Sequence, residues 1–221
     1  GLHGWHIECS AMSMAELGEN FDMHCGGVDL IFPHHENEIA QSESVTGKQF
    51  VNYWMHSEFL SIDGDKMSKS VGNVYNIKDL KKMGFSPESI RYQLLSCHYR
   101  KKVIFSKRKK NEIDKVISRF LSFHNLLISK EANLINGAGL PNEYLEFCSK
   151  MNNDLNVSEA LGVFFTWMKS VKKKIIEKQI SIKGLGEAWM FLSIFNNIFD
   201  FIDMKKSELP ENVKIILKKR M

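Results

Sequence analysis

Three side chains in the first 40 residues of this 221-residue sequence are of types that bind transition metals. His34 and Glu38 are four residues apart in a segment with helical spacing, so both project from one face of the expected helix. Cys9 precedes His34 by 25 residues. A thiolate, an imidazole and a carboxylate are all zinc ligands in proteins. The pattern predicts a zinc site, and the alternative is a solvated helix start with a buried thiol.

The charge pattern around these residues favours a cation site. The first 47 residues contain no Lys or Arg but eight carboxylates and five of the eight histidines. Structural zinc usually has four protein ligands. His24, Cys25, His35 or a residue upstream of Gly1 could therefore complete the set.

Residues 101–130 reverse this balance, with nine basic residues against two acidic ones. Such a surface suits a polyanion such as RNA, because lysine and arginine side chains neutralise phosphates. The alternative is a solvated helix face.

A polar run that contains two lysines, Lys66-Met67-Ser68-Lys69-Ser70, follows Asp63-Gly64. Two ammonium groups in a loop suit a triphosphate, because they stabilise the negative charge that develops during phosphate chemistry. A solvated basic turn is the alternative.

This run resembles the KMSKS signature of class I aminoacyl-tRNA synthetases, with all five letters intact. Other segments are similar to successive signatures of the cysteinyl-tRNA synthetase family, densely over residues 1–106 and more loosely to about residue 165. They are Gly4–Met12, Gly26–Leu30, Phe32–Glu38, Tyr53–His56, Arg91–Tyr92, Ser96–Arg100, Asn152–Asn156 and Glu159–Leu161.

The resemblance implies ATP-dependent ligation of L-cysteine to its tRNA through a cysteinyl-adenylate, with Zn²⁺, ATP and Mg²⁺ as cofactors. It implies that the zinc ion selects the substrate thiolate. It also implies a cytoplasmic monomer, with tRNA, L-cysteine and ATP as partners and no membrane. The implied zinc ligands are Cys9, His34 and Glu38. The implied cysteine pocket contains Trp5, His6 and His24. The implied ATP site contains Gly27 and Asp29 at the ribose and Lys69 at the phosphates, assisted by Lys66 and Ser68.

The sequence starts at Gly1 without an initiator Met and runs directly into patterned sequence, so we expect a piece of a longer protein. In the family, the HIGH motif and a fourth zinc ligand, a cysteine, lie upstream, so we expect this piece alone to be inactive. Two alternatives are open. One is a cysteine ligase of the kind used in mycothiol synthesis, and the other is a non-enzymatic module that binds zinc and RNA.

The composition limits the fold class. A hydrophobic fraction of 43% and a charged fraction of 25% are typical of a globular chain with a core. No apolar run approaches the roughly 18–20 residues of a membrane-spanning helix, and no secretion signal is visible. Four scattered cysteines suggest reduced thiols rather than a disulfide framework.

Hydrophobic spacing predicts an α/β region followed by an all-α region. By resemblance, these are the second half of a Rossmann-like catalytic domain, a stem-contact region and a helical bundle. We expect domains at 1–62, 63–106 and 107–221.

The spacing predicts a helix over 5–17, a strand over 21–25, a helix over 34–45 with Pro33 in its first turn, and a strand or strand pair over 51–62. It then predicts a polar loop over 66–73, a linker over 133–141 and helices over 77–83, 87–97, 107–127, 142–151, 158–179 and 186–203. The aromatic side chains of the last helix, Phe191, Phe195 and Phe199, are expected in the bundle core.

Overall fold

The computed structural model describes residues 4–63, 65, 66 and 74–203, with only the main chain of residues 65 and 66. The chain forms two compact units. The N-terminal unit is Gly1–Met67 with Tyr99–Phe105, and the helical unit is Ser68–His98 with Ser106–Met221. The expected order of an α/β region and then a helical region is confirmed. The division into three domains stays a prediction.

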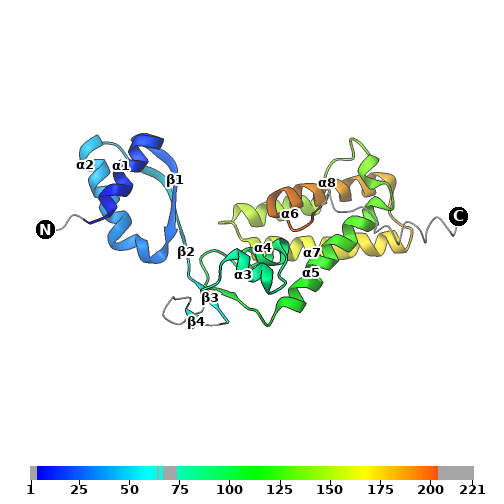
Figure 1. The fold of residues 1–221 in the computed structure, drawn as a ribbon. Helices are drawn as coiled ribbons and strands as arrows, with labels where there is room; N and C mark the ends of the chain where they lie inside the picture. The colour runs from blue at the N-terminus through cyan, green and yellow to red at the C-terminus, as the bar shows by residue number, and fades with distance from the viewer. Residues whose placement is uncertain (1–3, 64, 67–73, 204–221) are drawn as a thin grey trace. The chain divides into compact units, whose positions relative to one another are not determined.

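The N-terminal unit is built around a pair of parallel strands, with Phe21 opposite Val51 and His24 opposite Trp54. Parallel strands need a crossover connection, and a helix provides it here. The two helices pack against each other beside the strand pair (Figure 1). In chain order the elements are α1 (His6–Leu17), β1 (Phe21–Gly27), α2 (Glu36–Thr46) and β2 (Val51–Ser57).

The entry into α2 differs from the expected one. Two turns precede the helix, a 3-10 turn over Val28–Leu30 and a π turn over Ile31–His35. Phe32 is extended, at φ −132° and ψ 132°, because the ring of the following proline disfavours helical backbone in the residue before it. Helical backbone runs from Pro33 through His35 into α2, so Pro33 lies at the start of the helical stretch as expected, but its first turn is a π turn rather than an α-helical one.

A small second sheet completes the N-terminal unit, with the strand order β4-β3-β5. The strands are β3 (Leu60–Ile62), β4 (Asp65–Lys66) and β5 (Val103–Phe105). β3 pairs with β4 antiparallel and with β5 parallel. The expected strand or strand pair over 51–62 is found as two strands, β2 and β3, which lie in different sheets and do not pair with each other, and β5 was not expected.

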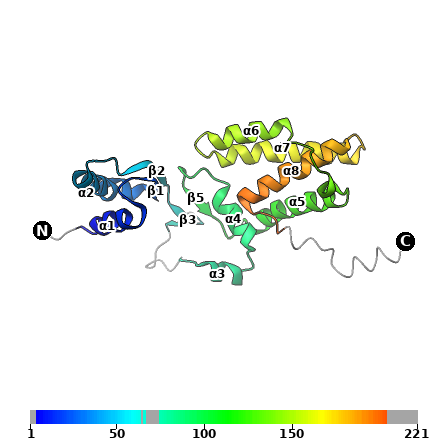
Figure 2. The ribbon, with the colours of Figure 1, turned by 90° about the horizontal axis from the view of Figure 1, so that it is seen from above.

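The helical unit confirms each helix expected after residue 76, with end points shifted by a few residues. α6 packs along α7, as Figure 2 shows from above. Every helix in the described part of the chain is too short or too polar to cross a lipid bilayer. The helices are α3 (Ile77–Lys82), α4 (Pro87–Leu95), α5 (Lys110–Ile128), α6 (Asn142–Asn152), α7 (Val157–Ile176) and α8 (Ile182–Phe199), with a 3-10 turn at Ala132–Leu134.

Aromatic rings fill the core of the helical unit. Phe164 of α7 and Phe195 of α8 are fully buried and stack with 3.6 Å between ring centroids. Phe120 of α5 and Phe191 of α8 are also fully buried against this pair. Buried aromatic pairs add to the stability that their buried area provides. The expected aromatic core of the last helix is confirmed.

The chain turns back onto this core after α8. The helix ends at Asp200, which has a left-handed backbone at φ 51°. The Asn196 side-chain amide donates to the Ile202 carbonyl at 2.9 Å and accepts from the Ile202 N–H at 2.8 Å. Both bonds are buried, and they hold Phe201 and Ile202 in the core.

Candidate metal centre

Cys9, His34 and Glu38, the three residues proposed as metal ligands from the sequence, lie together in the N-terminal unit. One ligand atom from each lies within 4.8 Å of those of the other two. Cys9 comes from α1, His34 from the turn before α2, and Glu38 from the first turn of α2. The packing of α1 against α2 thus brings the distant thiol to a pair already adjacent on one helical face.

Glu38 is the centre of the cluster and is completely buried. Its Oε1 lies 2.7 Å from His34 Nε2, and its Oε2 lies 3.5 Å from His24 Nδ1. Neither contact has hydrogen-bond geometry, so both carboxylate oxygens lack a hydrogen-bond partner among the described residues. A buried carboxylate without partners is costly, and a bound cation removes that cost.

The electrostatics of the cluster disfavour every charged form when no metal is bound. Burial raises the pKa of the Glu38 carboxyl to about 7. Burial, then the charges of Glu38 and Glu8, raise the pKa of the Cys9 thiol. Burial lowers the pKa of His34, with a further contribution from His6. A divalent cation reverses this balance, because it binds thiolate, carboxylate and neutral imidazole. The donor set and the unpartnered oxygens fit a zinc ion.

The side chains expected in a cysteine pocket surround His34 and Glu38. The Trp5 ring lies 4.1 Å from the His34 ring and is 61% exposed, so it forms an open wall. His6 meets His34 edge-on at 5.7 Å between ring centroids. His24 faces Glu38 from β1. The structure thus brings Trp5, His6 and His24 to the metal-ligand candidates.

The residues expected to bind ATP are only partly within the described structure. Gly27 ends β1, and a Cβ on it would meet Asp29 Oδ1 at 2.5 Å, so the absence of a side chain leaves room for this carboxylate. The main chain of Lys66 lies in β4. Ser68 and Lys69 lie outside the described residues.

The sequence analysis missed His56 and the ring stack beneath the cluster. His56 Nε2 lies 2.8 Å from His35 Nδ1 in a hydrogen bond. Trp54 stacks on His24 with 4.7 Å between centroids. The signal was present in the alternation of β2, since residues 54 and 56 share one strand face. Which residues of β1 lie opposite Trp54 and His56 depends on the register of the two strands. The hydrophobic spacing within one segment does not reveal that register.

The basic stretch over 101–130 is only partly available to a partner. Lys110 forms an ion pair with Asp114 at 2.6 Å, and Lys107 donates to the Tyr75 hydroxyl at 3.1 Å. The exposed members are Lys101, Lys102, Arg108, Lys109, Lys115, Arg119 and Lys130.

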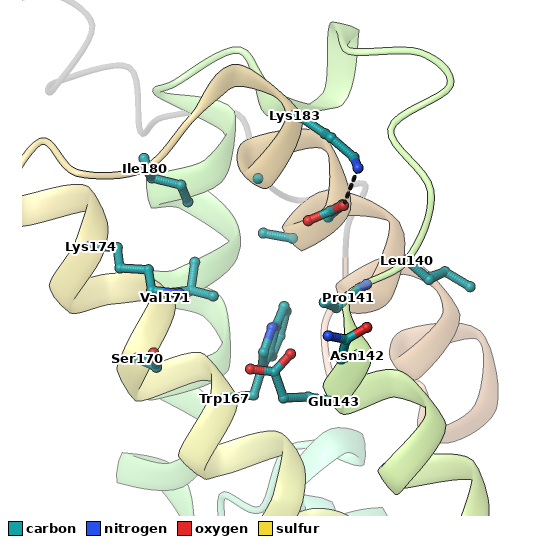
Figure 3. Close-up of a pocket in the computed structure, with 13 residues that line it drawn as sticks. Leu140, Pro141, Asn142, Glu143, Trp167, Ser170, Val171, Lys174, Ile180 and Lys183 are labelled. Carbon is teal, nitrogen blue, oxygen red and sulfur yellow. Dashed lines mark ion pairs between the residues drawn. The ribbon is translucent and has the colours of Figure 1, made fainter.

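A cavity of about 420 Å³ lies in the helical unit, where α6 and α8 begin beside the second half of α7. Trp167 lines it, with the Glu143 carboxylate beside the indole (Figure 3). At its rim Lys183 pairs with Glu187 at 3.6 Å. None of the expected site residues whose side chains the structure describes lines this cavity.

The fold agrees with the comparisons to known proteins, and the family models identify the class of the chain. The chain belongs to the class I tRNA synthetases, because residues 1–115 match the family model described as the tRNA synthetases class I (C) catalytic domain. Residues 146–202 match the DALR domain model, which covers most of α6 to α8.

The curated relatives are more specific, since they are named cysteine--tRNA ligase. The chain is 44% identical to the one from Brachyspira hyodysenteriae over 96% of this chain and 46% of the relative. It is 39% identical to the one from Chlamydia muridarum over 100% of this chain and 49% of the relative. The chain thus spans about half the length of these relatives.

A solved structure with a similar fold is LeuRS of Agrobacterium radiobacter in a ternary complex with tRNA and LeuAMS. The TM-score is 0.65, with 13% identity over 85% of this chain and 28% of that one. This likeness supports the fold alone.

Proposed function

We propose that the protein containing this chain joins L-cysteine to its tRNA in an ATP-dependent reaction that passes through a cysteinyl-adenylate. The observation that carries the proposal is the convergence of Cys9, His34 and Glu38 on one buried point. The names of the curated relatives give the reaction class.

The three side chains suit zinc because they combine a soft thiolate with an imidazole and a carboxylate. A zinc ion held there would supply a soft Lewis-acidic centre for the thiolate of the substrate cysteine. Trp5 and His6 then line the space next to the metal ligands and orient the substrate cysteine. A pocket that recognises sulfur directly discriminates strongly against serine, whose hydroxyl is a harder ligand.

The ATP subsite in this proposal contains Gly27 and Asp29 at the ribose. Lys69, Lys66 and Ser68 lie at the phosphates, and Mg²⁺ is the counter-ion of the phosphates. The carboxylate of Asp29 accepts hydrogen bonds from ribose hydroxyls. We expect Lys69→Ala to slow adenylate formation more than it weakens ATP binding, because its ammonium group acts where charge develops. Pyrophosphate exchange at the wild-type rate would exclude this role.

The tRNA partner is supported by the exposed basic residues of the stretch over 101–130. Phosphate contacts from these side chains predict that the affinity for tRNA falls steeply as salt increases. A cysteine ligase of the mycothiol kind needs no such surface, and a non-enzymatic module needs no cysteine pocket. We include a cytoplasmic location in the proposal, because the free thiols of Cys9, Cys25, Cys97 and Cys148 suit a reducing compartment. The monomeric state is included only as what the family resemblance implies.

The decisive experiment replaces Cys9 by alanine in the whole protein. We expect both the bound zinc and the cysteine-dependent ATP–pyrophosphate exchange to be lost, because the thiolate is a ligand. Cys148→Ala is the matched control, since this thiol lies on α6 in the helical unit. Unchanged zinc content in Cys9→Ala would overturn the assignment of the site.

A further inference from the structure

The cavity in the helical unit carries chemistry that the proposed ligase reaction does not use. Its volume is about 420 Å³, which lies within the range of small-molecule sites in proteins. Residues of α6, α7 and α8 form its wall (Figure 3). We propose that this cavity binds a purine nucleoside 5′-monophosphate, with the base at Trp167 and Glu143 and the phosphate at Lys174.

Trp167 offers an unused hydrogen-bond donor to the cavity. The residue is 3% exposed, and its indole points into the cavity beside the Glu143 carboxylate (Figure 3). Among the described residues, no acceptor receives a hydrogen bond from the indole N–H. A buried tryptophan N–H usually has a partner, and the lack of one costs free energy. A ligand atom that accepts from this N–H would remove that cost.

Three phenylalanine rings hold the indole in place. The centroid of the Trp167 ring lies 4.5 Å from that of Phe191, 5.1 Å from that of Phe164 and 5.6 Å from that of Phe123. All three phenylalanines are fully buried, and they come from α8, α7 and α5. A donor that three helices fix in this way needs little further ordering when a ligand binds.

The cavity has opposite charges at its two ends. Glu143 lies beside Trp167, whereas Lys174 is seven residues beyond Trp167 on α7. Neither charged side chain has an ion-pair or hydrogen-bond partner among the described residues. Lys183 is different, because it pairs with Glu187 at the rim. A complementary ligand therefore has a hydrogen-bond donor at one end and an anion at the other.

The distance between the two ends selects the class of ligand. Seven residues of α-helix rise about 10 Å, which is too far for an α-amino acid to span with its ammonium and carboxylate groups. A purine nucleotide is long enough to reach from Trp167 to Lys174. The Watson–Crick edge of adenine has a ring nitrogen that can accept from the indole N–H and an amino group that can donate to Glu143. Its phosphate would then pair with the Lys174 ammonium group.

This inference goes beyond the ligase reaction. The cavity shares no lining residue with the candidate metal centre, and it lies in the other compact unit. Ser170 lines the cavity between Trp167 and Lys174 on α7, so a large side chain there would fill the space that the ribose needs.

The test titrates adenosine 5′-monophosphate (AMP) into the whole isotope-labelled chain and follows the indole N–H signals of the four tryptophans by NMR. Trp167→Phe identifies the Trp167 signal, because it removes the N–H and keeps an aromatic ring. We expect AMP to shift this signal until the site is saturated. Adenosine lacks the phosphate and ribose 5-phosphate lacks the base, so each should bind at least about tenfold more weakly than AMP.

Variants test the two ends of the cavity separately. Glu143→Gln and Lys174→Gln should each weaken AMP binding about tenfold, because each removes a charged partner of the ligand. Lys173→Gln is the matched control, since Lys173 is exposed and does not line the cavity, and it should bind AMP like the wild type. Ser170→Phe should abolish the shift, and circular dichroism checks that each variant is folded.

Three results would overturn the proposal. One is a Trp167 signal that millimolar AMP does not move. Another is equal AMP binding by the Lys174→Gln and Lys173→Gln variants, which is also the result expected if AMP binds only at the proposed ATP subsite. The third is ribose 5-phosphate that binds as tightly as AMP, because it would show that the base is not recognised.

Discussion

The N-terminal unit and the helical unit are stabilised by different kinds of interior. The helical unit buries phenylalanine rings against each other, as at Phe164 and Phe195. The N-terminal unit contributes few of the buried apolar side chains in the described structure, and these are Phe50, Val51, Ile62 and Phe105. Its buried polar residues are Ser10, His34, His35, Glu38 and Ser42, which are a larger share of its interior than Ser89, Gln93, Ser106, His124 and Asn196 are of the interior of the helical unit. A unit that gathers candidate metal ligands in its interior therefore gives up part of the apolar interior that would stabilise it.

Helix capping follows this division only in part, since α5 and α6 of the helical unit also lack a side-chain hydrogen bond at their N-caps. α1 and α2 have no side-chain hydrogen bond at their N-caps. Several helices of the helical unit have such a bond, from the cap residues Asn76, Ser86, Asn156 and Ser181. Side-chain caps stabilise helices locally. These four helices of the helical unit are thus stabilised by side-chain hydrogen bonds at their starts as well as by the core.

The largest effect is expected from Phe195→Ala. The ring is fully buried and stacked, so its removal leaves a cavity and should lower the free energy of unfolding by about 3–5 kcal/mol. Urea unfolding followed by far-ultraviolet circular dichroism measures this change. Ile198→Ala is the control, because Ile198 is 47% exposed on the same helix and should change stability by no more than about 0.5 kcal/mol. Equal losses in the two variants would contradict an aromatic core.

The second prediction concerns Glu38→Met, which exchanges a buried unpartnered carboxylate for an apolar side chain of similar length. The metal-free variant should be more stable than the metal-free wild type by about 1–3 kcal/mol, because an unsatisfied polar group leaves the interior. It should also fail to bind zinc. Thermal unfolding with and without zinc measures both effects.

The matched control for that experiment is Glu36→Met, which changes an exposed carboxylate on the same helix. It should bind zinc like the wild type. A metal-free Glu38→Met variant less stable than the wild type would show that the carboxylate has a stabilising role that its contacts do not reveal.

The third prediction tests the difference in capping. The Asn156 side chain accepts a hydrogen bond from the Glu159 N–H at 3.2 Å at the start of α7. Asn156→Ala should lower the free energy of unfolding by about 0.5–2 kcal/mol, whereas Asn156→Asp keeps the acceptor and should retain most of it. If the two variants unfold at the same urea concentration, the cap does not contribute.

The smallest expected change in the free energy of unfolding occurs only at acidic pH. It comes from His124, a buried histidine of α5 that packs on Trp189. Burial lowers the pKa of His124 below its ordinary value of 6.5, and the hydrogen bond to Asn125 opposes this. The unfolded chain then binds more protons than the folded one below pH 6.5. The His124 contribution to stability is therefore constant above that pH and falls as the pH decreases below it. His124→Gln should remove this part of the pH dependence in urea titrations, and an unchanged profile would contradict it.

Local patterns predicted most of the helices and the three proposed metal ligands. His34 and Glu38 are close because of helical spacing, and the aromatic face of α8 repeats with helical period, so both were visible within one segment. Cys9 was identified by its chemistry and by the resemblance of its segment to a known signature.

The features that the sequence did not reveal depend on contacts between distant segments. β5 is only three residues long and exists because it pairs with β3, about 40 positions earlier. The stacking of His24 on Trp54 requires the strand register that places them opposite each other, and the bond between His35 and His56 joins a turn to a strand. Pro33 was correctly expected at the start of the helical stretch, but the π turn over Ile31–His35 was not visible in the local pattern.

The amide of Asn196 has a consequence for how α8 can vary. It uses both its donor and its acceptor on the main chain of one residue, Ile202, so it pairs with that residue as a neighbouring strand would. Aspartate at this position has almost the same shape, but it would place an oxygen against the Ile202 carbonyl, where the amide now donates. Asn196→Asp, which hardly changes the side-chain volume, would therefore break the hydrogen bond to the Ile202 carbonyl. The segment after α8 would then detach from the bundle, and Phe201 would leave the core.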